Sequence, residues 1–203
     1  MPLIKYNNQS LSSITALPSG VPSGKLKLIS SQTASNSASI SFTTGLNSTY
    51  KVYRFVFVNI HARTDGTDFQ FNMSTDSGSN YNVTKTTTHF RTFHNEADTS
   101  TNLSYGTGGD LAQDTGYQQL INGIGSAADE SGSGYMLLFN PASTTYVKHF
   151  IADTNSYNQG GSYSYRSFNA GYGNTTSAVN AIRFQMSSGN FDGTIYLYAI
   201  QND

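Results

Sequence analysis

Short segments rich in β-branched and aromatic residues, separated by turn-forming residues, recur from Lys25 to the end of the chain. Such segments favour strands, and apolar residues at helical spacing are almost absent. Ten strands punctuated by turns predict an all-β fold, an antiparallel β-sandwich of jelly-roll type. The expected strands cover residues 25–30, 37–43, 50–60, 69–74, 89–93, 135–139, 145–151, 163–168, 179–186 and 194–200.

Two of these segments differ in how their side chains divide between the faces of a sheet. In residues 37–43, apolar and hydroxyl side chains alternate, as in a strand with one buried face. Residues 50–60 carry apolar side chains on both faces, which predicts a central strand or one covered on both sides. Arg54 interrupts one of these faces, and we expect it near a sheet edge or paired with a carboxylate.

The first 24 residues differ in composition from the rest and end in a hinge rich in Pro and Gly. We expect residues 1–24 to form an extended N-terminal arm, with a reach of about 3.3 Å per residue, and residues 25–203 to form one β-sandwich domain. A frayed terminus is the alternative. The residues expected to anchor the arm to another protein or to a symmetry mate are Ile4, Tyr6, Leu11, Ile14 and Leu17.

Residues 95–134 form the longest stretch without a strand-like segment and hold half of the acidic residues. We therefore predict a long loop insertion near 95–134, which in a compact domain is usually functional or flexible. The sequence leaves open whether acidic loops bind Ca²⁺, because no EF-hand pattern is present. The acidic residues of this stretch are Glu96, Asp98, Asp110, Asp114, Asp129 and Glu130.

The chain offers little material for catalysis. It has no cysteine, 11% charged residues and a net charge of -1, which argues against a general nucleic-acid binder. His89 and His94 are the only close pair among four histidines, and their spacing places them on opposite faces of a strand. We expect the histidines to be satisfied surface or interface residues. With no nucleophile, phosphate or dinucleotide motif, we expect no catalytic, cofactor-binding or metal site.

Four tyrosines are set among Asn and Gly residues near the C-terminal third of the chain. Tyrosine has a flat apolar face and a polar tip, which suits both sugar rings and protein interfaces. One interpretation is a glycan-contacting or interface surface, and the other is that Tyr163 and Tyr165 share one face of a strand and pack against its neighbours. The four residues are Tyr157, Tyr163, Tyr165 and Tyr172.

Two stretches point to a family. ISSQTASNSASISFTTGLNSTYKVYRFVFVNI followed by FQFNMSTDSGSNYN, within residues 29–82, resembles the opening of a group of structural proteins of tailed bacteriophages, notably marine and cyanobacterial ones. AGYGNTTSAVNAIRFQMSSGNFDGTIYLYAI, residues 170–200, resembles the closing strands of the same group. The resemblance implies an exterior β-domain of the virion, a fibre or head-decoration component, without enzymatic activity. It carries over no functional side chain, and the acidic stretch and the arm depart from its pattern.

These observations lead to one expected function and two alternatives. We expect a non-enzymatic structural protein, displayed on the head or tail exterior and anchored through its arm, with other virion proteins as partners and a homotrimer as the assembly. Assembly in the host cytoplasm without membrane insertion is expected, since neither a signal peptide nor an apolar run of about 20 residues is present. One alternative is a carbohydrate-binding, host-adhesion module. The other is a jelly-roll hydrolase whose acids would be drawn from Asp98, Asp110, Asp114, Asp129 and Glu130.

Overall fold

The computed structural model describes residues 26–159 and 162–201, and the expected arm, residues 1–24, lies outside them. The described residues form twelve strands and no helix, and every strand pairing is antiparallel, which confirms the all-β class. The strands are β1 (Leu26–Ser37), β2 (Ser39–Phe42), β3 (Val52–Ala62), β4 (Thr67–Ser74), β5 (Lys85–Asn95), β6 (Thr101–Tyr105), β7 (Gln118–Ile124), β8 (Gly132–Phe139), β9 (Lys148–Asn158), β10 (Tyr163–Gly173), β11 (Ala181–Met186) and β12 (Phe191–Ile200).

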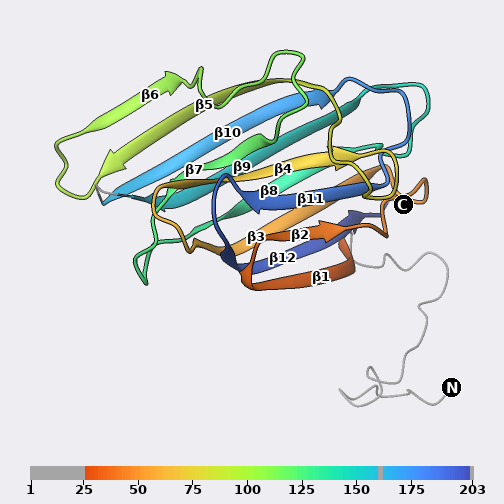
Figure 1. Ribbon diagram of the computed structural model, residues 1–203. Coiled ribbons are helices and arrows are strands. Elements are labelled where there is room, and N and C mark those ends of the chain that lie inside the picture. The colour runs from red at the N-terminus through yellow and green to blue at the C-terminus, as the bar shows by residue number, and fades with distance from the viewer. Residues whose placement is uncertain (1–25, 160–161, 202–203) are drawn as a thin grey trace, which may run out of the picture.

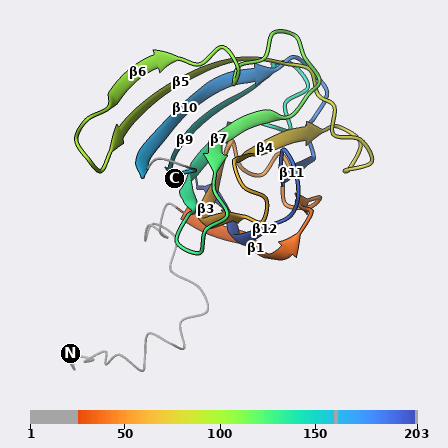
Figure 2. The ribbon, with the colours of Figure 1, turned by 60° about the vertical axis from the view of Figure 1, so that its left-hand side comes forward.

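The strands form one hydrogen-bonded sheet that curls almost back on itself (Figure 1). Neighbours follow the order β1-β12-β3-β8-β9-β7-β4-β11-β2, and β10, β5 and β6 branch away from β9. The branch arises because β9 pairs with β8 and β10, whereas it pairs with β7 only at Ile124 and Asn158. Figure 2 shows β5, β6, β9 and β10 as a long ribbon that extends past β7 and β4.

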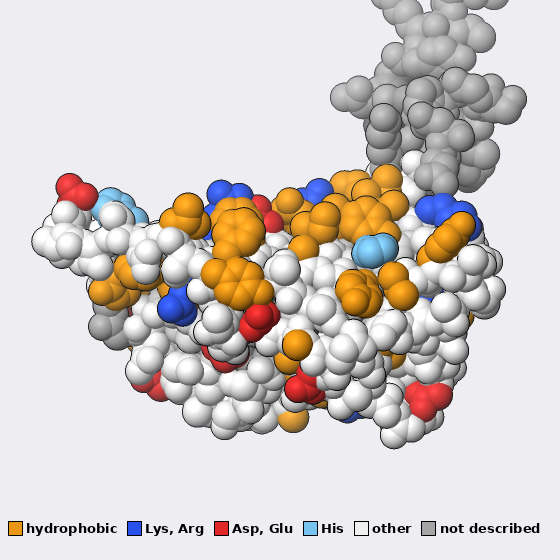
Figure 3. Space-filling view, turned by 90° about the horizontal axis from the view of Figure 1, so that it is seen from above, with side chains coloured by type: hydrophobic (Ala, Val, Ile, Leu, Met, Phe, Trp, Pro, Cys, Tyr) orange, Lys and Arg blue, Asp and Glu red, His pale blue; other side chains and the backbone are white. Residues whose placement is uncertain are grey.

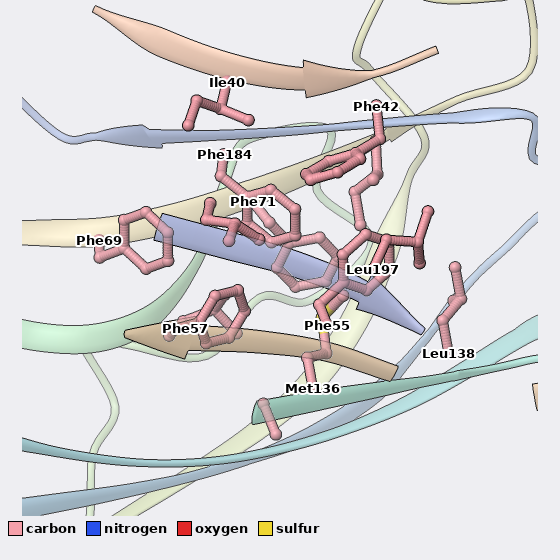
Figure 4. Packing of buried hydrophobic residues seen from close by; sticks show 14 of the residues in the cluster. Ile40, Phe42, Phe55, Phe57, Phe69, Phe71, Met136, Leu138, Phe184 and Leu197 are labelled. Atoms are coloured by element: carbon pink, nitrogen blue, oxygen red, sulfur yellow. The ribbon is translucent and has the colours of Figure 1, made fainter. Parts of the chain in front are cut away.

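The hydrophobic core lies inside this curl, where β3 faces β4 and β11. Phe184 on β11 is its centre, and it is fully buried. Its ring centroid lies 5.2 to 6.3 Å from those of five other phenylalanines. Edge-to-face and offset arrangements of this kind add to the stabilisation from buried area. These neighbours, several of which are labelled in Figure 4, are Phe42, Phe55, Phe57, Phe69 and Phe71.

The prediction that residues 50–60 form a central strand is confirmed, since β3 lies between β12 and β8. Two details differ. Ile60 joins the buried face because Asn59, at a φ of 51°, introduces a bulge that shifts the register. Arg54 does not lie at an edge and pairs with no carboxylate of residues 26–159 and 162–201. Its guanidinium instead lies 4.4 Å from the centroid of the Tyr135 ring.

The prediction that residues 95–134 lack strands is wrong. The stretch contains β6, β7 and the start of β8. In β7, Gln118 and Gln119 are buried, although glutamine normally marks an exposed position. Gln118 is tolerated because its Nε2 donates to the carbonyls of Gly109 and Gln119 at 2.7 and 2.8 Å. A buried strand with polar side chains does not produce the apolar run or the alternation that sequence reasoning requires.

Candidate functional site

The strands β1, β12, β3, β8, β9, β10, β5 and β6 lie side by side, and one face of this run packs on the core and on β7. We call the opposite face the outer face. Antiparallel register places its side chains in rows that cross the strands. One row is Tyr196, Val56, Tyr135, Asp153, Phe168 and Phe90, and the next is Tyr198, Arg54, Leu137, Ile151 and Ala170.

The outer face is apolar and is left exposed by the described residues. Leu28, Ile151 and Phe90, from β1, β9 and β5, are 51%, 48% and 43% exposed. Their neighbours in the rows are mostly half-buried, because large side chains on adjacent strands shield one another. Figure 3 shows hydrophobic side chains gathered along one side of the molecule, while the other side of the view is mainly polar. A contiguous apolar surface of this kind marks a contact site.

The few charged groups on the outer face are held by neighbours on the same face. Arg166 forms a two-pronged ion pair with Asp153, at 2.8 and 2.6 Å, and its guanidinium lies 4.4 Å from the Phe168 ring centroid. The hydrogen bond to Asp153 raises the pKa of Arg166, so the guanidinium stays charged at neutral pH. Arg54 lies over Tyr135 in the same manner. The ion pair carries no net charge, and Arg54 leaves one positive charge without a carboxylate partner among the described residues.

Two of the shallow hollows on the outer face lie next to each other. The larger, about 460 Å³, is lined by residues of β5, β8, β9 and β10, among them Phe139, His149 and Tyr172. The smaller, about 240 Å³, lies beside it and is lined by residues such as Phe90, Tyr135 and Phe168. Aromatic and aliphatic side chains line most of both hollows, so either receives an apolar side chain more readily than a charged one.

A third hollow, about 300 Å³ in volume, is polar and lies on the other side of the β5 ribbon. We call it the polar hollow. Asp68 on β4, His89 and Arg91 on β5, and Gln119 and Asn122 on β7 line it. Tyr105 and the turn of residues 106–109 complete its wall. Glycine is required in this turn at 106 and 109, since a Cβ at either position would collide with the His89 ring.

The polar hollow contains both hydrogen-bond donors and hydrogen-bond acceptors. Burial lowers the pKa of His89, whose Nδ1 lies 2.8 Å from Asn169 Oδ1, so its ring is neutral at neutral pH. Arg91 donates to the Tyr165 hydroxyl at 2.8 Å, and Asp68 accepts from the Gly123 amide at 2.8 Å. Neither Arg91 nor Asp68 forms an ion pair with another described residue.

The structure does not bring the four predicted tyrosines together. Tyr163 and Tyr165 share the inner face of β10 and pack on Phe93, which agrees with the interpretation that they pack against strand neighbours. Burial raises the pKa of Tyr165. Tyr157 and Tyr172 belong to the outer face, but at opposite ends of the β9–β10 pair. Tyr157 donates to the Ser162 hydroxyl at 3.0 Å, and Tyr172 packs on His149.

The histidines and loop carboxylates are dispersed. His89 and His94 lie on opposite faces of β5 as predicted, but His89 is buried and not a surface residue. Asp110 accepts from the Tyr105 hydroxyl at 2.8 Å, and Glu130 accepts from the Ala127 amide at 2.7 Å, which are local turn contacts. Within residues 26–159 and 162–201, no group of three or more His, Cys, Asp or Glu residues is placed to hold a metal ion.

Sequence reasoning found only part of these surfaces. The outer face was signalled by residues 50–60, where both faces are apolar, although nothing in the chain showed that one face stays uncovered. The polar hollow had no signal, because it joins residues of β4, β5 and β7 that are distant in sequence.

No protein-family model matches the chain, and a search of the curated proteins finds no match. The part of the chain that the structure describes contains no helix long and apolar enough to cross a membrane.

Proposed function

We propose that this chain is a non-enzymatic structural protein of a tailed phage virion. It is displayed on the exterior of the head or tail, as a decoration or fibre component, and works as a symmetric homo-oligomer such as a homotrimer. The observation that carries the proposal is the outer face, a broad apolar surface that another protein surface must cover in the working assembly. The resemblance of residues 29–82 and 170–200 to phage structural proteins supports the virion as its place.

The finer fold class that we propose is a jelly-roll sandwich with an extension. The order of strands supports it: β1-β12-β3-β8 and β7-β4-β11-β2 are two runs of four strands joined through β9. Ring contacts of Phe184 with Phe55 and Phe57 link the two runs across the core. The strands β9, β10, β5 and β6 extend the first run and broaden the outer face. Two facing four-stranded sheets of this kind make up a jelly roll.

The proposal predicts where the chain is found and what holds it there. An antibody against the folded domain is expected to bind intact purified particles, because the domain is on the exterior. Removal of residues 1–24 is expected to leave a folded domain that is lost from particles, since Ile4, Tyr6, Leu11, Ile14 and Leu17 are the proposed anchors. Mass spectrometry of particles made with either chain measures this. A chain absent from wild-type particles contradicts the virion role, and unchanged incorporation of the shortened chain contradicts the anchor.

A second candidate function, binding of a neutral saccharide for host adhesion, is favoured by the polar hollow. Each sugar hydroxyl both donates and accepts hydrogen bonds. A saccharide site therefore needs hydrogen-bond donors and acceptors close together. Arg91 and Asn122 supply donors, Asp68 supplies an acceptor, and Tyr105, which is 52% exposed, provides an aromatic face at the rim. Gln119 adds a buried side-chain amide to the wall of the hollow.

Saturation-transfer NMR with a panel of neutral monosaccharides at millimolar concentration tests this second function. We expect a signal for at least one sugar and a loss of about tenfold or more in affinity for Asn122→Ala, the cost of one or two hydrogen bonds. Asn155→Ala on the outer face is the matched control and is expected to bind as the wild type. An absence of signal for every sugar removes this candidate and leaves the structural role intact.

A further inference from the structure

We propose that the outer face is the surface through which copies of this chain associate, so that its occupant is a second copy of the same chain. The inference deepens the proposed structural role, on which it rests, because it assigns the homo-oligomer contact to named strands. The size, the charge and the shape of the face all favour this occupant.

The size of the outer face matches that of a stable protein interface. From β1 to β5 it spans seven strands, which at about 4.8 Å per strand is roughly 30 Å. Along β3 it runs from Val52 to Val58, about 20 Å at the rise of a strand. The flat area is thus roughly 600 Å², and projecting side chains increase the accessible area toward the ~800 Å² per partner of a standard interface.

The outer face has few unpaired charges, which favours an apolar protein surface as its partner. Its ion pair, Asp153 with Arg166, is complete within one copy, and Arg54 lies against Tyr135. A nucleic acid or an anionic lipid surface needs clustered unpaired Lys and Arg, which this face does not present in the described residues. A second copy meets most of this surface with apolar side chains, and the contact must accommodate the charge of Arg54, whose guanidinium lies on the Tyr135 ring. Interfaces between identical chains are the more apolar class.

The shape of the face supplies both parts of a self-association contact. Leu28, Ile151 and Phe90 project from it, and the hollow of about 460 Å³ beside His149 and Tyr172 is open on it. Because one surface carries both projections and a hollow, the same surface on another copy is able to complement it, as the two-fold contact of a dimer, or of a larger assembly built from dimers, requires.

The N-terminal segment is the competing occupant. Besides the five apolar residues that we expected to anchor an arm, residues 1–24 contain Met1, Leu3, Ala16 and Val21, and polar residues separate most of these side chains. An extended segment is one strand wide, about 4.8 Å, so it covers only a strip of an apolar surface seven strands wide. We therefore assign the outer face to a second copy and leave the arm for a different partner.

Sedimentation velocity of the purified full chain tests the inference. The wild type is expected to sediment at a multiple of its 21.9 kDa mass at micromolar concentration. Ile151→Lys, at the centre of the face, is expected to weaken self-association by roughly 30-fold or more, since it buries an unpaired charge between copies. Tyr146→Lys is the matched control: Tyr146 is 69% exposed in the loop between β8 and β9, and its substitution is expected to leave the mass unchanged.

Circular dichroism shows whether each variant folds. Both substituted side chains are exposed, so both variants are expected to give the spectrum of the folded chain. If Ile151→Lys fails to fold, Leu137→Lys in the same row provides the second test. A monomeric wild type overturns the inference, as does an oligomer that Ile151→Lys and Leu137→Lys leave intact. Neither result contradicts the virion role, which antibody binding to particles measures separately.

Discussion

Phe184→Ala is expected to lower the free energy of unfolding by about 3 to 5 kcal/mol, the range for removing a fully buried aromatic ring. The ring of Phe184 contacts five phenylalanine rings from β2, β3 and β4. Alanine would leave a cavity among these rings. The sheet is unable to close this cavity, because β3 and β4 are held on opposite sides of the core. Contacts of β3 with β4 and β11 would weaken together.

Urea titration followed by circular dichroism measures this loss. Protein concentration must be the same for each variant, since association raises apparent stability. Tyr146→Ala serves as the control, because Tyr146 is 69% exposed, and it is expected to change the free energy of unfolding by less than about 0.5 kcal/mol. A change below about 1 kcal/mol for Phe184→Ala would contradict the position of this ring at the centre of the core.

The second large effect comes from a buried lysine at the start of β5. Lys85 is fully buried, and its Nζ donates to Asn72 Oδ1 at 2.6 Å and to the Val83 carbonyl at 2.7 Å. Burial lowers its pKa from 10.5 to about 7, although the nearby charge of Asp114 acts in the opposite direction. Lys85 is therefore partly neutral in the folded chain at neutral pH and charged in the unfolded chain.

This difference predicts how stability depends on pH. Below pH 7 both states bind the proton, and folding bears the full penalty of burying the charge. Between about pH 7 and about pH 10.5 the unfolded chain still binds a proton that the folded chain has lost. The free energy of unfolding therefore rises with pH across this window, by up to about 1.4 kcal/mol per pH unit from this residue.

Lys85→Met isolates this contribution, since methionine keeps most of the length of the side chain and carries no proton. Chemical denaturation at several pH values between 6 and 10.5 is expected to show a wild-type curve that rises relative to the Lys85→Met curve. Lys51→Met, at an exposed lysine, is expected to run parallel to the wild type. Parallel curves for Lys85→Met and the wild type would mean that Lys85 keeps its proton in the folded chain.

The elements that sequence reasoning predicted are those whose buried side chains are apolar. In β3, Tyr53, Phe55 and Phe57 alternate with outward residues, and a strand with such a pattern is recognisable without any knowledge of its neighbours. The all-β class followed from many segments of this type. The identity of the strand neighbours did not follow, because pairs such as β1 with β12 join the two ends of the chain.

The elements that sequence reasoning missed depend on distant partners. β7 buries Gln118 and Gln119, and only the carbonyl of Gly109 and other groups brought by the fold make that burial tolerable. The bulge at Asn59 moves Ile60 to the other face, and a single residue with positive φ leaves no periodic signal. The polar hollow likewise exists only after β4, β5 and β7 have met.

For the outer face, the sequence indicated the type of surface but not the partner that covers it. The apolar pattern on both faces of residues 50–60 predicted a central strand or one covered on both sides, and among the described residues Val56 is half-buried and Val58 is 37% exposed. A sequence specifies the chemistry of such a surface without specifying its occupant. The occupant must come from a measurement on the assembly.

A three-dimensional reconstruction of the intact particle tests the central claim most directly. The account predicts density for this fold on the exterior of the head or tail, with the outer faces of neighbouring copies in contact and Ile151 inside the contact. A particle in which the fold is absent, or in which the outer face of every copy is exposed to solvent, would contradict it.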